Sequence, residues 1–278
     1  MREKSLPLNH PDFGSIYNNI GTAYSSLGDD QTALSYYQKT LEIQEKILPS
    51  THVDLAISYG NIGTIHSSMG DHLKTLEFHE KSLKIREISL PSNHPDIATS
   101  YNNIGSVHNA MGDYTIALSF FQKSLDIRQK SLGEDHISFA NIYDNLGSVY
   151  NSIGDKSKAL AYYEKALEIQ QKSCSNNHPD LVNTYNNISL IYHSMEDCTK
   201  ALSFLQQALD LQFKSRSENH PSLATTYNNL GLIHNSMKDY STALSFYEKA
   251  LVIQQNSKST RDQSLATTYF NMGLTYYS

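Results

Sequence analysis

Long apolar segments are missing from this chain of 278 residues. Only 39% of the residues are hydrophobic, and no apolar run approaches the ~18 residues that a membrane-spanning helix needs. Basic residues are also scarce: 22 Lys and Arg stand against 28 Asp and Glu, which gives a net charge of −6. Because phosphate binding needs a basic surface, we expect no nucleic-acid binding. Because no apolar run is long enough, we expect no membrane insertion.

Cysteine is nearly absent. Cys174 and Cys198 hold non-equivalent places in neighbouring copies of the repeat described below, so we expect no disulfide framework. The first residues, MREK, are followed by no apolar segment, and no secretory signal peptide is predicted. These absences favour a reducing, cytoplasmic setting.

Signs of catalysis are missing as well. The sequence has no Gly-rich phosphate loop, no nucleophile placed beside a base and no clustered pair of carboxylates. We therefore expect no enzyme activity and no cofactor.

An internal repeat is the main positive feature. A Tyr stands two positions before an Asn seven times at a spacing of 42 residues: Tyr17/Asn19, Tyr59/Asn61, Tyr101/Asn103, Tyr143/Asn145, Tyr185/Asn187, Tyr227/Asn229 and Tyr269/Asn271. A fixed period of this size indicates one supersecondary unit stacked on copies of itself. Such a chain is a solenoid that is stabilised by contacts between neighbouring units.

Each unit reads as two amphipathic helices. In the first copy, apolar residues recur at helical spacing from Ile16 to Leu27 and again from Leu34 to Ile43, which predicts helices over about 11–27 and 30–47. Gly28 is suited to the left-handed end of the first helix, and Asp29 to the N-cap of the second. Gly70, Gly112 and Gly154 repeat this turn. The alternating plan leaves no room for a sheet, so the fold class is all-α.

Histidines also follow the period, at His10, His52, His94, His136, His178 and His220. Packed helices lie ~8–10 Å apart, whereas zinc ligands must lie within ~2–2.3 Å of one ion. Single histidines in successive units therefore cannot converge on a metal, and we expect them to cap the first helices. His66, His108 and His234 replace the Tyr found at Tyr24 and Tyr150, which predicts a packing role for them.

The block Tyr17-x-x-Ile20-Gly21-x-x-Tyr24, followed by Ala33-x-x-x-Tyr37, resembles the tetratricopeptide repeat. The resemblance covers almost the whole chain and implies a right-handed superhelical solenoid of stacked antiparallel helix pairs. Ordinary repeats of that family have about 34 residues, and the longer unit with Asn-Asn and His-Pro is similar to kinesin light chains and nephrocystin-like proteins. Tyr17 and Gly21 depart from the Leu and Ala usual in kinesin light chains, and the heptads that hold the motor are absent. The repeat subtype therefore carries over, and the motor association does not.

The repeat divides the chain into a tail of a preceding unit at 1–9, six units over 10–261 and the first helix of a seventh over 262–278. The six cores are expected at 14–47, 56–89, 98–131, 140–173, 182–215 and 224–257. Residues 1–10 align with 85–94, which is the end of a second helix and its loop. We therefore expect a fragment of a longer array.

The resemblance implies that the first helices line a concave groove that takes an extended peptide or a partner helix. It also implies that an Asn of these helices binds the peptide backbone, at Asn19, Asn61, Asn103, Asn145, Asn187 and Asn229. An amide offers two donors and an acceptor for that purpose, but the same Asn can instead bond the neighbouring helix and stabilise the stack. The preceding position varies more, and its Asn18, Asn102, Asn186 and Asn228 are added to the candidates.

No Lys or Arg occurs in any first helix, and small uncharged residues such as Thr22 and Ser25 stand beside the Asn. An uncharged groove cannot hold a terminal carboxylate by charge-assisted contacts, as chaperone-binding members of the family do. Basic residues gather instead in the second helices, where we expect a solvated outer face: Lys39, Lys46, Lys81, Lys84, Arg86, Lys123, Arg128 and Lys130.

These features favour a non-catalytic scaffold that binds extended segments of partner proteins, with a cargo or assembly adaptor as one form of it. The alternative is a regulatory or sensor arm of a larger enzyme or signalling ATPase. The identity of the partner and the oligomeric state are not indicated.

Overall fold

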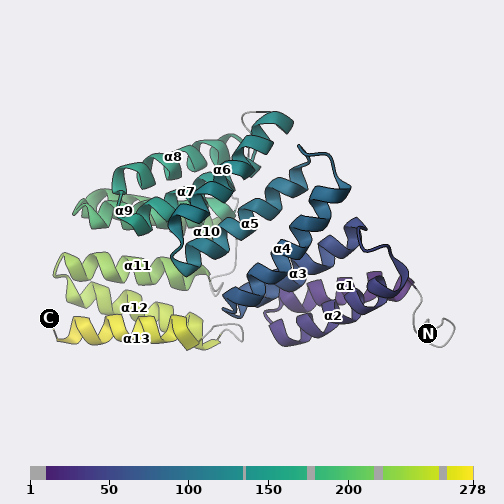
Figure 1. Ribbon diagram of the computed structural model, residues 1–278. Helices are drawn as coiled ribbons and strands as arrows, with labels where there is room; N and C mark the ends of the chain where they lie inside the picture. Colours follow the sequence, from purple (N-terminus) through teal and green to yellow (C-terminus); the bar gives the residue numbers. More distant parts are fainter. Residues whose placement is uncertain (1–10, 134–135, 174–178, 216–221, 257–261, 278) are drawn as a thin grey trace. The chain divides into compact units, whose positions relative to one another are not determined.

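The computed structural model describes residues 11–133, 136–173, 179–215, 222–256 and 262–277. These residues form thirteen α-helices and no strand (Figure 1). The helices are α1 (Pro11–Ser26), α2 (Asp30–Ile47), α3 (Val53–Ser68), α4 (His72–Ser89), α5 (Pro95–Met111), α6 (Tyr114–Ser131), α7 (Ser138–Ile153), α8 (Lys156–Ser173), α9 (Pro179–Ser194), α10 (Cys198–Ser215), α11 (Ser222–Ser236), α12 (Tyr240–Asn256) and α13 (Asp262–Tyr276). The all-α prediction is confirmed, and α1 and α2 agree with the expected 11–27 and 30–47 to within a residue.

Each odd-numbered helix from α1 to α11 pairs with the even-numbered helix that follows it, across a short turn. Gly28 adopts a φ of 77°, and the Asp29 carboxylate accepts a hydrogen bond from the backbone N–H of Thr32 at 3.1 Å. Gly70, Gly112 and Gly154 are also left-handed, as predicted. In the fifth and sixth pairs this place is held by Glu196 (φ 64°) and Lys238 (φ 61°), where a side chain meets the steric cost that Gly avoids.

Close packing of the two helices in a pair depends on a Gly in the first helix. A Cβ on Gly105 would lie 2.8 Å from the ring of Phe121, and one on Gly231 would lie 2.5 Å from the ring of Tyr247. In the fifth pair the Gly is replaced by Ser189, and the facing residue is the buried aliphatic Leu205. The two replacements fit each other, because Leu205 has no aromatic ring at this position.

The chain divides after residue 134 into two compact bodies, α1–α6 and α7–α13. In the first body a buried cluster joins Ala33 and Tyr37 of α2 to Ile62 and Ile65 of α3. In the second, a larger cluster runs from Leu205 of α10 through α11 to Ile253 of α12. Each body is therefore held together by apolar contacts between successive helix pairs, as expected for a stacked repeat.

Six of the described histidines have the capping or packing roles that the sequence predicts. His52 Nδ1 accepts from the backbone N–H of Asp54 at 3.2 Å, and His94 and His136 cap α5 and α7 in the same way. His66 stacks on Phe78 with ring centroids 5.5 Å apart, and His108 and His234 pack on the corresponding Phe of their pairs. His10, His178, His220 and Cys174 lie outside the described residues.

Candidate functional site

The Asn-Asn dipeptide of the repeat places two side chains at the junction between successive helix pairs. We call its first place the leading position (Asn18, Gly60, Asn102, Asp144, Asn186, Asn228) and its second the trailing position (Asn19, Asn61, Asn103, Asn145, Asn187, Asn229). Asn61 Nδ2 donates to Asn18 Oδ1 at 3.0 Å, and Asn229 Nδ2 donates to Asn186 Oδ1 at 2.9 Å. At these two junctions, the trailing Asn of one unit bonds the leading Asn of the unit before it.

Leading side chains also bond the first helix of the next unit. Asn186 Nδ2 donates to Thr226 Oγ1 at 3.1 Å, and Asn228 Nδ2 donates to Thr268 Oγ1 at 2.8 Å. Asp144 takes the same place in the fourth unit, where the hydroxyl of Thr184 donates to its carboxylate at 3.0 Å. These bonds lie between α7 and α9, α9 and α11, and α11 and α13, so they contribute to stacking.

The ten candidate Asn differ in their access to solvent. Asn19 is exposed, Asn186 is buried, and the other eight are half-buried: Asn18, Asn61, Asn102, Asn103, Asn145, Asn187, Asn228 and Asn229. The amides of Asn19, Asn103 and Asn187 take part in none of the hydrogen bonds of the described residues. These three trailing amides therefore remain open to a ligand.

A column of buried hydroxyl groups accompanies the leading position and was not anticipated. It consists of Ser58, Ser100, Thr184, Thr226 and Thr268 on the first helices. Each of these helices meets a polar residue of a second helix: Ser58 Oγ donates to Gln44 Oε1 at 2.6 Å, and Thr268 Oγ1 to Gln254 Oε1 at 3.0 Å. The signal in the sequence is the recurrence at the 42-residue period of Gln or Arg, and of Ser or Thr except at Ile16 and Ile142, on otherwise apolar helix faces.

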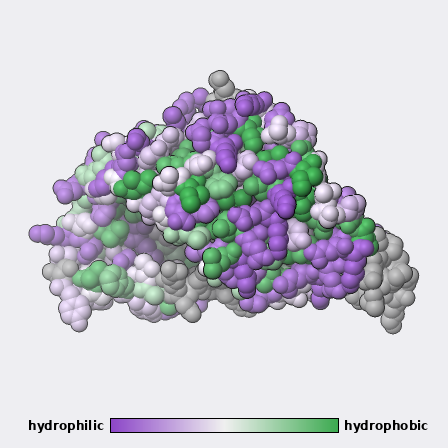
Figure 2. Space-filling model, in the orientation of Figure 1, coloured by the Kyte–Doolittle hydropathy of each residue, from purple (hydrophilic) through white to green (hydrophobic). Residues whose placement is uncertain are grey.

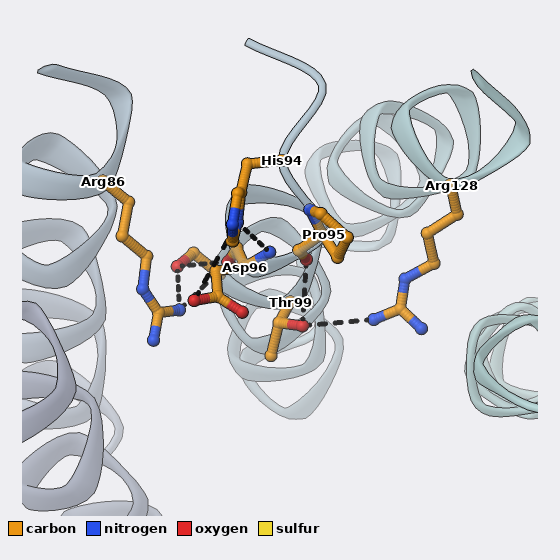
Figure 3. Close-up of polar contacts among 7 residues, drawn as sticks. Arg86, His94, Pro95, Asp96, Thr99 and Arg128 are labelled. Atoms are coloured by element: carbon orange, nitrogen blue, oxygen red, sulfur yellow. Dashed lines mark hydrogen bonds and ion pairs between the residues drawn. The ribbon is translucent and has the colours of Figure 1, made fainter. Parts of the chain in front are cut away.

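Arg86 and Arg128 are corrections to the expected solvated face. Figure 3 shows their guanidinium groups on either side of the first turns of α5. Arg86 Nη1 donates to the Asp96 carbonyl at 3.0 Å and to Ser100 Oγ at 2.7 Å, while Arg128, 6% exposed, reaches Thr99 Oγ1 with Nη2 at 3.4 Å. Both occupy the place of Gln44 in the repeat, so cations from second helices reach α5 although the first helices have none.

The lysines of that set are exposed, as predicted, and several lie over aromatic rings. Lys39 Nζ lies 4.9 Å from the ring centre of Tyr36 and 5.7 Å from that of Tyr17. The same arrangement recurs at Lys81, Lys123, Lys165 and Lys249. Tyr59 Oη donates to Glu45 of the preceding second helix at 2.8 Å. The repeated Tyr therefore faces the second helices and belongs to packing.

Cavities open between consecutive first helices in the first body. One of about 240 Å³ between α1 and α3 is lined by Ser15, Asn18, Asn19, Gln44, Asp54 and Ile57, among others. Another of about 330 Å³ between α3 and α5 is lined by Thr64, Ser67, His72, His79, Asn103 and Ser106, among others. Their linings are mainly amides, hydroxyls and imidazoles. On the face seen in Figure 2, hydrophobic and hydrophilic residues are interspersed.

Burial perturbs two titratable groups of these junctions. It lowers the pKa of His79 to about 4, with help from the charge of Arg86, so the imidazole is neutral at pH 7. It raises the pKa of Asp144 to about 7, against hydrogen bonds from Thr184 and Gln170 that favour the carboxylate.

Among the described residues, no three His, Cys, Asp or Glu are grouped closely enough to bind a metal. Within the same residues, no helix is both long and apolar enough to cross a membrane.

The comparisons with known proteins agree with this architecture. The family model described as tetratricopeptide repeat matches residues 12–88, 96–172, 158–212 and 222–278. No curated protein matches the sequence.

Several solved structures share the fold at low sequence identity. A P. anserina protein with nearly identical repeats of the kinesin light chain type is 22% identical, with a TM-score of 0.58 over 74% of this chain and 97% of its own. BtubC (BKLC) of P. vanneervenii is 20% identical, with a TM-score of 0.61 over 85% of this chain and 89% of its own. The APC/C hetero-tetramer Cut9–Hcn1 is 17% identical, with a TM-score of 0.66 over 96% of this chain and 43% of that one.

Proposed function

Because this chain belongs to the tetratricopeptide repeat family, we propose that it is a non-catalytic scaffold whose first helices bind an extended segment of a partner protein. The observation that supports this most directly is the row of open amides on those helices. Asn19, Asn103 and Asn187 recur at multiples of the 42-residue period, and their amides are not used by the stack. Each can donate to and accept from a peptide group.

The geometry supports different roles for the leading and the trailing Asn positions. Leading residues such as Asn186, which is buried, and Asn228, which is half-buried, bond the next first helix and so hold the units in register. Two trailing residues, Asn61 and Asn229, are used by the stack, because a leading Asn accepts a hydrogen bond from each. The proposal therefore assigns peptide binding to the trailing positions that remain open, and stacking to the leading ones.

The chemistry of this face favours a neutral, hydrogen-bonding segment. The cavity between α1 and α3 contains one acid, Asp54, among uncharged groups. Arg86 is half-buried and already bonded to Asp96 and Ser100, so it offers little free charge to a ligand. The proposal also includes the absence of a nucleic-acid partner, which the net charge of −6 supports. It includes a cytoplasmic setting, which the presence of only two cysteines supports.

A random peptide library displayed on phage and selected on the purified chain tests the proposal. Peptides that bind are then measured against the triple variant Asn19→Ala, Asn103→Ala, Asn187→Ala. A matched control replaces three exposed amides of the second helices, Gln38, Gln122 and Gln206, by Ala.

We expect the first variant to lose about 0.5–1.5 kcal/mol of binding free energy for each hydrogen bond removed, with an unchanged melting temperature. The control should bind like the wild type. Equal affinity of all three proteins would remove these Asn from the binding surface, and absence of any binding peptide would contradict the proposed function.

A further inference from the structure

The cavity between α3 and α5 is lined by His79, at a position where the first, fourth and sixth units carry a Tyr. In the first unit, the phenol of Tyr37 reaches Thr22 Oγ1 at 3.1 Å. In the second unit His79 replaces that Tyr, and Thr64 replaces Thr22. The Thr64 hydroxyl donates to the Gly60 carbonyl at 3.0 Å, as the Thr22 hydroxyl does to the Asn18 carbonyl. An imidazole is shorter than a phenol, so space opens between His79 and the two first helices.

The same helix α3 also carries a smaller residue at its leading position. This is Gly60, the one Gly at a leading position. Asn61 and Asn229 each donate to a leading Asn that lies 43 residues earlier in the chain. The residue 43 positions before Asn103 is Gly60, which has no side chain to receive that bond. A Cβ placed on Gly60 would meet only Ser82 Oγ, at 3.6 Å. A side chain can therefore begin at Gly60 without a clash at its Cβ.

Two polar side chains that line the cavity have no partner in the first body. His79 is 4% exposed, and neither ring nitrogen takes part in a hydrogen bond of the described residues. The amide of Asn103 is likewise unused. Their polar atoms reach solvent, so a ligand that bonds both side chains replaces water at a site that is already formed.

The lining selects a neutral group that both donates and accepts. It contains no acid, Lys or Arg. Thr64 and Ser106 donate their hydroxyl protons to carbonyl groups of their own helix and so present lone pairs to the cavity. A carboxylate would lose its hydration here without meeting a cation, and an ammonium group would meet no counter-charge.

We propose that this cavity binds the carboxamide of an Asn or Gln side chain from the partner segment. The carboxamide oxygen accepts from Asn103 Nδ2, and its NH₂ group donates to the imidazole of His79 and to the hydroxyl oxygens of Thr64 or Ser106. It thereby supplies the group that a leading Asn provides at other junctions. A volume of about 330 Å³ is at the small end of ligand pockets, ~300–1,000 Å³, which suits one side chain with its adjoining backbone. The inference rests on the proposed function.

Filling the cavity gives a test in which the variants keep the fold. Gly60→Asn restores the missing leading Asn, and His79→Tyr restores the phenol found at Tyr37. Both place a residue that the chain already uses at the corresponding position of another unit. The probe is N-acetyl-glutamine methylamide, and binding is followed by the NMR shifts of the Asn103 side-chain amide and the His79 ring. The matched probes are the blocked derivatives of glutamate and methionine, which have a similar length.

We expect the glutamine probe to shift both signals in the wild type. In Gly60→Asn and in His79→Tyr, which lacks the His79 ring, the affinity is followed by the Asn103 signal and should be at least about tenfold lower. The glutamate and methionine probes should leave the two signals unchanged. The proposal is overturned if no probe shifts them, if all three shift them equally, or if the filled variants respond like the wild type.

Peptides selected from the library separate this inference from the proposed function. If they bind, replacing their Asn or Gln residues one at a time by Glu or Met should identify one position whose effect disappears in His79→Tyr. Binding that shows no such position leaves the scaffold function standing and overturns the carboxamide site. If no peptide binds at all, the proposed function fails, while the blocked glutamine still decides what the cavity takes.

Discussion

Replacing Asp144 by Asn should stabilise the second body at neutral pH. Asp144 is the one acid at a leading position, and Asn is found there in the first, third, fifth and sixth units. Its carboxylate accepts from Thr184 Oγ1 at 3.0 Å and from Gln170 Nε2 at 3.0 Å. An Asn at this place keeps the bond from Thr184. Gln170 Oε1 has no partner within the described residues, so rotation of the Gln170 amide lets it accept from the new NH₂ group.

The magnitude follows from the pKa of Asp144. Burial, with a contribution from the charge of Asp180, raises the pKa to about 7 in the folded protein, compared with ~3.9 in an unfolded chain. A carboxyl group with a raised folded pKa binds its proton more tightly when folded. Its contribution to stability is therefore greatest below pH ~4, falls as the pH rises to about 7 and is constant above. A shift of roughly three units corresponds to about 4 kcal/mol as an upper limit.

Urea unfolding of the wild type and Asp144→Asn, followed by circular dichroism from pH ~5 to ~8, measures this difference. Hydrogen exchange of α7 and α9 amides locates it. We expect the variant to gain up to about 4 kcal/mol at pH ~8, with a gain that shrinks toward pH ~5. Asp210→Asn, an exposed position in the same body, is the control and should change little. A difference between wild type and Asp144→Asn that does not vary with pH would refute the reasoning.

Three further substitutions and one comparison test the packing. Gly231→Ala should cost about 1–3 kcal/mol by forcing a Cβ into the ring of Tyr247, measured by urea unfolding against Gly273→Ala, where the space is open. Lys238→Gly should raise stability by about 1 kcal/mol in the same assay, because it relieves a left-handed backbone; a loss would show that the Lys side chain outweighs the strain. Asn61→Ala should lower the free energy of unfolding, in the same assay, by the ~0.5–1.5 kcal/mol of one hydrogen bond. Amides of α13 should exchange faster than those of α5, since α13 exposes large apolar side chains such as Phe270 at 65%; equal protection would contradict this.

The features of the fold that the sequence predicts are those with a local cause. Gly28 and Asp29 set the turn within a pair, and His52 caps a helix two residues away. Each depends on neighbours in the chain, so its pattern repeats visibly in the sequence. The pairing of Ser189 with Leu205 depends on contact between two helices, and it becomes understandable only when their separation is known.

The candidate site was predicted less completely, because its contacts join residues about 40 apart. The sequence identifies the Asn positions but not that Asn61 is used by the stack while Asn103 is open. It also misplaces Arg86 and Arg128, since helical periodicity gives a face of the helix and not the depth to which a long side chain reaches between neighbours. The cavity at His79 is lined by residues of α3, α4 and α5. In the one-dimensional repeat, His79 and Gly60 appear only as scattered exceptions.

Photo-crosslinking of a selected peptide tests most directly the claim that partners bind on the first helices. A benzoylphenylalanine placed at successive positions of the peptide is activated in the complex, and mass spectrometry identifies the crosslinked residues. The account predicts crosslinks on the first helices, near Asn19 and Asn103, which the triple Asn variant abolishes. Crosslinks concentrated instead on the second helices, for example at Lys39 and Tyr36 of α2, would contradict it.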